Sequence, residues 1–188
     1  MNNIITIIKN SNDYYTIDNI IKKNINNIDI IENIIKYSVS NNNYQILKIV
    51  FDNGFDITKL NKLHKLFMIA CINNNFDIIN ILILRFPDYA LHYHDDKAFR
   101  LAARYGNIEV VEYLINNLPN INYHAKREYA FRWSCINGFI EIAILLKKYY
   151  PDIDHHVLDN HVELLPQVIE LRKNNFIINS TKSARKVI

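Results

Sequence analysis

The stretch Ala98-Phe-Arg-Leu-Ala-Ala-Arg-Tyr-Gly-Asn-Ile-Glu-Val-Val-Glu-Tyr-Leu-Ile115 decides the fold of this chain. Its first half has the apolar spacing of a short helix that is buried along one face. Its second half carries apolar pairs, Val110–Val111 and Tyr113–Leu114, that leave two sides of a helix apolar. Gly106 separates the halves, and glycine readily adopts the left-handed conformation that ends a helix. The stretch therefore predicts two helices joined by a tight turn.

The same pattern recurs along the chain at a constant step, which is the separation of Asn74 from Gly106. The position of Gly106 is occupied elsewhere by Asn42, Asn74 and Gly138, and asparagine also tolerates the left-handed conformation. A small residue precedes each turn, as Ser38, Ala70, Ala102 and Ser134. A fixed period of about 20–50 residues indicates a stacked array, in which each unit buries its apolar face against its neighbours.

Residues beside each turn predict where the second helix begins and ends. Three asparagines occupy the position of an N-cap: Asn43, Asn75 and Asn107. Three prolines, separated by the same repeat step, follow the second helices and are expected to stop them: Pro87, Pro119 and Pro151. Each unit is thus expected to be a helix, a turn, a second helix and an extended connector.

The repeat step also divides the chain into segments. We expect a degenerate N-terminal capping unit over residues 1–28, with helices over 4–9 and 14–23. Four repeats are expected to follow, over residues 29–58, 59–90, 91–122 and 123–154. A C-terminal cap over residues 155–173 and a flexible basic tail over 174–188 complete the prediction.

The stretch from Ala98 to Ile115 resembles an ankyrin repeat, which has the pattern Leu-His-x-Ala-Ala-x-x-Gly-His-x-x-Val-Val-x-x-Leu-Leu. The segment Asn53-Gly-Phe-Asp-Ile57 resembles the Gly-Ala-Asp-Val segment of the same family. The paired Ala-Phe-Arg of 98–100 and 130–132, with the Ile and Asn bias, is similar to ankyrin proteins of giant (mimivirus-type) viruses. The resemblance covers residues 29–154 and implies an all-α ankyrin-repeat solenoid of about ten helices, stacked as antiparallel pairs.

The chain departs from the ankyrin pattern in its connectors. Ankyrin repeats usually have a step that is longer by one position, and they open with Thr-Pro-Leu-His, whose side chains tie down the first helix. Here the corresponding residues are Lys65-Leu-Phe-Met68, Lys97-Ala-Phe-Arg100 and Tyr129-Ala-Phe-Arg132. The connector hairpins are therefore expected to be short and degenerate.

Composition and motif spacing argue against catalysis and cofactor binding. Cys71 and Cys135 lie two steps apart in a buried position, which predicts two separated core thiols and a reducing location. His92, His124 and His156 share the repeat step, so we interpret them as solvated connector histidines too far apart to bind one metal. No catalytic residue, cofactor site or metal site is expected.

Charge and hydropathy exclude other classes. The formal net charge of +3 is too small to indicate nucleic-acid binding, and no apolar run is long enough to cross a bilayer. The first nine residues lack the pattern of a secretory signal. We therefore expect a cytoplasmic protein, located in the host cytoplasm if the chain is viral.

The resemblance implies a non-enzymatic adaptor, a monomer that binds a protein partner on the concave face of the stack. In the family, contacts come from the connector tips and the exposed side of the first helix. The matching tip residues are His64, Tyr93, His94, Asp96, Lys126 and Glu128. The matching helix residues are Ile72, Asn73, Arg104, Tyr105, Ile136 and Asn137.

Two alternatives remain open at this point. Tyr93 and Tyr105 can instead cover the flanks of the stack without binding a partner. The basic tail can bind nucleic acid or a membrane surface, with the repeats as a spacer. On the outer wall, Glu112, Asn116 and Lys147 are expected to be solvated.

Overall fold

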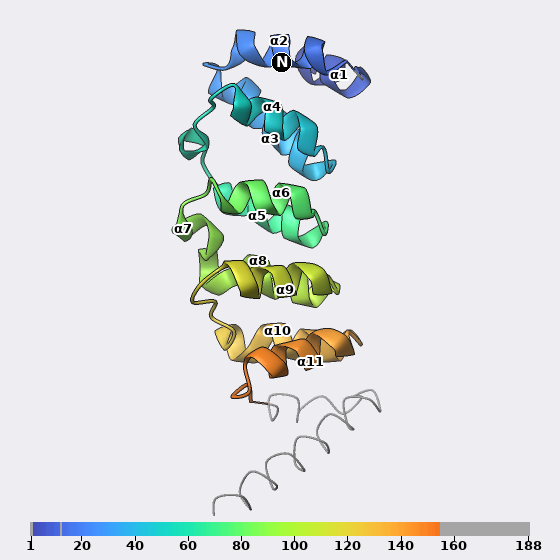
Figure 1. The fold of residues 1–188 in the computed structure, drawn as a ribbon, viewed down its shortest axis with the longest axis vertical. Helices are drawn as coiled ribbons and strands as arrows, with labels where there is room; N and C mark the ends of the chain where they lie inside the picture. The colour runs from blue at the N-terminus through green and yellow to red at the C-terminus, as the bar shows by residue number, and fades with distance from the viewer. Residues whose placement is uncertain (1, 12, 155–188) are drawn as a thin grey trace, which may run out of the picture. The chain divides into compact units, whose positions relative to one another are not determined.

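The structure, a computed structural model, describes residues 2–11 and 13–154 of the chain (Figure 1). These residues contain eleven α-helices, one 3-10 helix and no strand. The chain divides into two compact units, residues 1–98 (unit 1) and residues 99–188 (unit 2), which we describe separately. The predicted C-terminal cap and basic tail, residues 155–188, lie outside the described residues.

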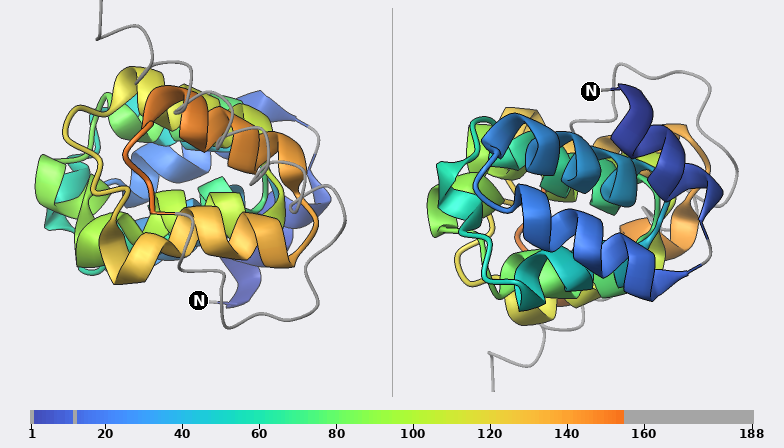
Figure 2. Two further views of the ribbon diagram at one scale, coloured as in Figure 1. Left: turned by 90° about the horizontal axis from the view of Figure 1, so that it is seen from below. Right: turned by 90° about the horizontal axis from the view of Figure 1, so that it is seen from above.

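Unit 1 consists of helix pairs. Its elements are α1 (Asn2–Asn10), α2 (Tyr14–Asn24), α3 (Ile28–Ser40), α4 (Tyr44–Asp52), η1 (Ile57–Lys59), α5 (Leu63–Ile72), α6 (Phe76–Ile83) and α7 (Asp88–Leu91). The first helices α1, α3 and α5 contact one another in that order, and so do the second helices α2, α4 and α6. Figure 2 (right) looks down on unit 1, so that the helices of successive pairs overlap in this view. The two helices predicted before residue 28 are present.

Unit 2 repeats the same arrangement. The boundary between the units falls inside α8 (Tyr93–Tyr105), which is followed by α9 (Ile108–Asn117), α10 (Ala125–Ile136) and α11 (Ile140–Tyr149). Helix α11 packs against both α10 and α9. The second helices bury one apolar side against the first helices and another against each other, as their paired apolar residues predict.

The turn between the two helices of each pair is the most regular feature of the chain. The residues predicted to be left-handed all have positive φ: Asn42 (55°), Asn74 (57°), Gly106 (84°) and Gly138 (80°). The amide of the next residue donates to the carbonyl five positions earlier, as Asn43 to Ser38 at 2.8 Å and Phe139 to Ser134 at 2.8 Å. This is the bond that closes a Schellman cap. The four predicted turns are confirmed.

Substituting Asn74 with glycine tests the left-handed geometry at low cost. Asn74 is exposed and has a φ of 57°, so removal of its Cβ relieves a small strain and removes no buried contact. We expect the free energy of unfolding to stay unchanged or to rise by up to about 0.5 kcal/mol. Urea denaturation of both proteins measures the difference. A loss of more than about 1 kcal/mol would contradict the left-handed turn.

The N-caps follow the prediction only in part. The Asn43 side chain accepts a hydrogen bond from the Ile46 amide at 3.1 Å, as a cap does. Asn75 and Asn107 occupy the N-cap position but make no side-chain capping bond. Asn75 is instead 1% exposed and its Nδ2 donates to the Val39 carbonyl of α3 at 3.4 Å. Its side chain thus links neighbouring helix pairs, which corrects the expected capping role.

The prolines end two of the three helices as predicted. Helix α9 stops at Asn117, two residues before Pro119, and α11 stops at Tyr149, two residues before Pro151. Helix α6 already stops at Ile83, and Pro87 begins the short helix α7 instead. Pro87 therefore starts a helical turn in the connector rather than ending the helix before it.

The described connectors contain helical turns, whereas the sequence suggested extended segments. Beside η1 and α7, two connectors contain three successive residues with positive φ, His94–Asp96 and Lys126–Glu128, which lie one repeat step apart. A left-handed turn costs L-residues roughly 1–2 kcal/mol each, so it needs tertiary contacts to hold it.

Candidate functional site

Three of the predicted tip residues of unit 1 form one aromatic stack. His64 at the start of α5 stacks on Tyr93 with ring centroids 3.6 Å apart, and Tyr93 stacks on His94 at 4.0 Å. His94 is exposed, and the other two rings are half-buried. The structure therefore brings together three of the residues that the sequence assigned to partner contact.

Positive charge surrounds this stack. The pKa of His64 is lowered, first by burial of the ring and then by Lys65, His94, Lys97 and Lys62. Each cation disfavours a second positive charge on the imidazole. The tip of unit 1 is thus both aromatic and cationic.

Ile72 and Asn73 lie apart from this stack, at the end of α5 beside the left-handed turn. Ile72 is half-buried, and Asn73 is exposed. His64 lies at the opposite end of α5, so unit 1 offers two separate groups of the expected residues.

In unit 2 the predicted residue Arg104 is held on an aromatic surface. Its guanidinium lies 4.3 Å from the ring centroid of Trp133 and its Nη1 donates to Tyr129 Oη at 2.8 Å. The side chain of Asn137, another predicted residue, donates to the Arg104 carbonyl at 2.7 Å. Arg104 is consequently fixed in place before any partner arrives.

Sequence reasoning missed Tyr129 and Trp133. The two rings sit four residues apart on α10, where their centroids are 5.8 Å apart, and Arg100 lies 5.2 Å from the Tyr129 ring. The signal was present in the sequence, because Trp133 is the single tryptophan of the chain and lies on the same helix as the predicted Ile136. Tyr105 is 54% exposed, Lys126 and Asn137 are exposed, and Ile136 is half-buried.

Two predicted contact residues are buried. Asp96 is 3% exposed and Glu128 is 5% exposed. Each carboxylate pairs with the histidine four residues earlier: Asp96 Oδ1 with His92 Nδ1, and Glu128 Oε1 with His124 Nδ1, both at 2.5 Å. The expectation that Asp96 and Glu128 are exposed tip residues is wrong, because they fasten the left-handed turns from inside.

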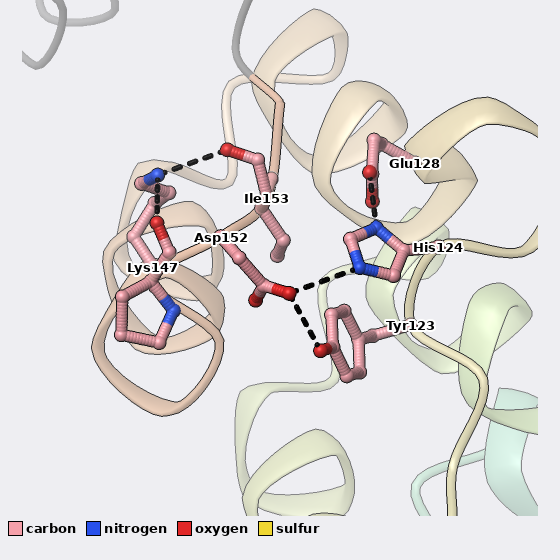
Figure 3. A network of polar contacts seen from close by, with 7 residues as sticks. Tyr123, His124, Glu128, Lys147, Asp152 and Ile153 are labelled. Atoms are coloured by element: carbon pink, nitrogen blue, oxygen red, sulfur yellow. Dashed lines mark hydrogen bonds and ion pairs between the residues drawn. The ribbon is translucent and has the colours of Figure 1, made fainter.

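The same bonds correct the interpretation of His92 and His124 as solvated connector histidines. In unit 2 the pair extends into a network, in which His124 Nε2 lies 3.2 Å from Asp152 Oδ2 and Tyr123 Oη donates to the same oxygen at 3.0 Å (Figure 3). Tyr123 also stacks on Tyr150 at 3.8 Å. The network joins the connector before α10 to the segment after α11.

Hydrogen bonds are the main cause of the pKa shifts of three groups in this network, Tyr123, His124 and Asp152. The bond with Glu128 is the main cause that raises the pKa of His124, and the bond with Asp152 adds to it while burial opposes it. The bond from Tyr123 is the main cause that lowers the pKa of Asp152, and that carboxylate in turn raises the pKa of Tyr123. Both ring nitrogens of His124 thus face a carboxylate, which favours the imidazolium.

The structure corrects the expectation that Lys147 is a solvated residue of the outer wall. Its Nζ donates to the backbone carbonyls of Pro151 at 2.9 Å and Ile153 at 3.0 Å (Figure 3). Burial lowers the pKa of this ammonium group. Lys147 therefore holds the segment after α11 against the helix end, whereas Glu112 and Asn116 are exposed as predicted.

The described residues offer few other chemical groups. Cys71 and Cys135 are buried free thiols, and burial raises the pKa of Cys71. No group of three metal-binding side chains occurs within residues 2–11 and 13–154. In the same part of the chain, no helix is long and apolar enough to span a bilayer. His156 lies outside it.

Comparison with known proteins bears on the repeat unit. Residues 67–159 match the family described as "Ankyrin repeats (3 copies)". Searches of curated proteins and of solved structures gave no match. The matched segment covers the turns at Asn74, Gly106 and Gly138 and the helix pairs around them. The stacked helix pairs confirm the all-α ankyrin-repeat fold, and the chain is an ankyrin-repeat protein.

Proposed function

We propose that the chain is a non-enzymatic adaptor that binds a protein partner through its first helices and connector tips, the face that is concave in ankyrin stacks. Ankyrin repeats generally mediate protein–protein interaction, and this chain contains such repeats. The proposed contact residues are His64, Ile72, Asn73, Tyr93 and His94 in unit 1 and Arg104, Tyr105, Lys126, Ile136 and Asn137 in unit 2.

The observation that carries the proposal is the ordered Arg104. Binding hot spots are enriched in Arg, Tyr and Trp, and their side chains contribute most when they need no reordering. Arg104 lies on Trp133, bonds to Tyr129 and neighbours the exposed Tyr105. A half-buried arginine with an aromatic support can donate to a partner carbonyl or carboxylate without losing further side-chain entropy.

Alanine substitutions at Arg104 and Tyr105 test this surface. We expect each to weaken partner binding by more than about 1 kcal/mol, the usual hot-spot scale. The measurement is a quantitative pull-down from source cytosol, followed by titration of the purified partner. Glu112→Ala and Asn116→Ala on α9 are the matched controls and are expected to change affinity little, since both residues are exposed on a second helix.

Two results would count against the proposal. Equal or larger losses from the α9 variants, with unchanged thermal stability in all four, would move the site to the second helices. A bound fraction that is nucleic acid or lipid, released steeply by salt and lost on deletion of residues 174–188, would favour the alternative function. The monomeric state, the cytoplasmic location, the viral resemblance and the division into repeat units remain predictions.

A further inference from the structure

Unit 1 contains a groove of about 780 Å³ between the neighbouring first helices α3 and α5. Its floor is apolar, formed in part by Leu66, which is buried, and Ile69, which is half-buried. Its rim carries Lys36 from α3 and Lys62 and Lys65 from the start of α5. The volume lies in the range of ordinary ligand sites, roughly 300–1,000 Å³.

The rim has an excess of positive charge. Glu32, also in the groove, pairs with Lys36 at 2.8 Å and neutralises it. Lys62 and Lys65 are exposed, and within the described part of the chain neither forms an ion pair. Residues 1–98 contain ten Lys and Arg and ten Asp and Glu, so the excess is local to the groove and not a property of the unit.

His64 lies beside the groove and is affected by the charges of the same rim lysines. It lies on α5 between Lys62 and Lys65, and the segment 93–97 packs His94 and Lys97 near it. Burial of the ring is the main cause that lowers the pKa of the His64 imidazole, and these neighbouring basic residues add to it. Among the described residues, α3 contributes Ser40 and two charged side chains to the groove, Glu32 and Lys36, which neutralise each other. The side of α5 that meets the groove therefore repels cations.

We infer that the α3–α5 groove binds an acidic segment of the partner protein, with carboxylates at Lys62 and Lys65 and an apolar side chain over Leu66 and Ile69. The inference rests on the proposed adaptor function and names the chemistry of the partner. The apolar floor favours a peptide over a polyanion, because single-stranded nucleic acid is bound by aromatic rings along a basic channel. Neither an aromatic ring nor an arginine lines this groove, and unit 1 is neutral.

The direct test uses a fluorescein-labelled peptide, acetyl-Glu-Asp-Glu-Leu-Glu-Asp-Glu-amide, titrated with the full chain and followed by anisotropy. We expect saturable binding that weakens with added salt, and a loss of at least tenfold in Lys62→Gln/Lys65→Gln. The control Lys22→Gln/Lys23→Gln removes the same charge from α2, outside the groove, and should change affinity less than twofold. Equal losses in both variants would overturn the inference, as would tighter binding of a labelled oligothymidine of matched charge.

His64, which lies between Lys62 and Lys65 in the sequence but does not line the groove, supplies a readout beside the site. A bound carboxylate favours the imidazolium, so the peptide should raise the pKa of His64 in an NMR titration and bind more tightly as the pH falls. The variant His64→Asn should still bind but lose this pH dependence. An unchanged His64 titration at saturating peptide, together with unchanged affinity in Lys62→Gln/Lys65→Gln, would place the peptide elsewhere and refute the inference.

The groove and the adaptor function can fail separately. A partner whose binding depends on Arg104 but not on Lys62 and Lys65 would leave the adaptor proposal intact and refute the groove. Peptide binding in the groove without any retained protein partner would support the groove chemistry and refute the adaptor proposal.

Discussion

Substitution of Gly106 with valine will lower the free energy of unfolding by about 3 kcal/mol or more. Gly106 has a φ of 84°, a conformation that strains a β-branched residue. A Cβ placed there would also lie 2.6 Å from Cε1 of Phe139, well inside van der Waals contact. Backbone strain and overpacking therefore act at the same position. Urea unfolding measures the loss, followed by the fluorescence of Trp133, the single tryptophan, which lies in unit 2.

The alanine variants of two glycines separate the two causes. Gly54 has a similar φ of 79°, but a Cβ there would meet nothing within 4 Å. Gly54→Ala should therefore cost only the backbone strain, about 1 kcal/mol, whereas Gly106→Ala should cost more. Phe139→Leu should recover part of the difference in the Gly106→Ala background. A neutral Gly106→Val would show that the turn is not left-handed.

The turns could be predicted because their chemistry is local. Asn74 and Gly106 occupy positions that only a few residue types tolerate, and the closing bond joins backbone groups five residues apart. The constant repeat step then placed the helices on both sides of each turn. Such features depend on neighbouring residues, which a single sequence displays directly.

The connectors could not be predicted because their partners are distant in sequence. His124 and Asp152 are 28 residues apart, and nothing in the pattern of either residue indicates the other. Lys147 resembles a solvated lysine until the backbone of Pro151 and Ile153 returns beside it. Burial of Asp96 and Glu128, two of the predicted tip residues, likewise depends on how the chain folds back.

In the candidate site, too, some features could be predicted from the sequence and others could not. Arg104 was assigned from its position before the turn, which is a repeat property. Its support by Trp133 and Tyr129 depends on packing between α8 and α10, although the spacing of four residues places both rings on one side of α10. Repeat position thus nominates candidate contact residues, whereas the packing that holds Arg104 in place comes from the following helix pair.

Removal of the His124 side chain will lower the free energy of unfolding by about 1–3 kcal/mol at pH 6. His124→Ala deprives the buried Glu128 carboxylate of the partner on Oε1, and Oε2 is already buried without a hydrogen-bond partner in the described structure. The substitution also releases Asp152 and the left-handed turn at residues 126–128. Chemical denaturation of wild type and variant gives the difference.

The difference in the free energy of unfolding between wild type and His124→Ala depends on pH, and this dependence identifies the charge on His124. Because the folded pKa of His124 is raised, its contribution is complete below about pH 6.5, the ordinary value, and declines as the pH rises through the folded pKa. The difference in the free energy of unfolding between wild type and His124→Ala should therefore become smaller from pH 6 to pH 8.5. The change should be modest, since about half of the side chain is exposed and solvent screens it.

A matched variant separates the charge of His124 from its hydrogen bond. His64, whose pKa is lowered, contributes to the pH dependence with the opposite sign, but it is common to all the proteins compared and cancels in the difference. His124→Asn keeps an amide that can donate to Glu128 and cannot titrate. At pH 6, His124→Asn should lose less free energy of unfolding than His124→Ala. The difference between His124→Asn and wild type should become smaller as the pH rises, by the same amount as for His124→Ala. A gap that widens with pH in either variant would mean that His124 is neutral in the folded protein, and the network would then be held by its neutral hydrogen bonds alone.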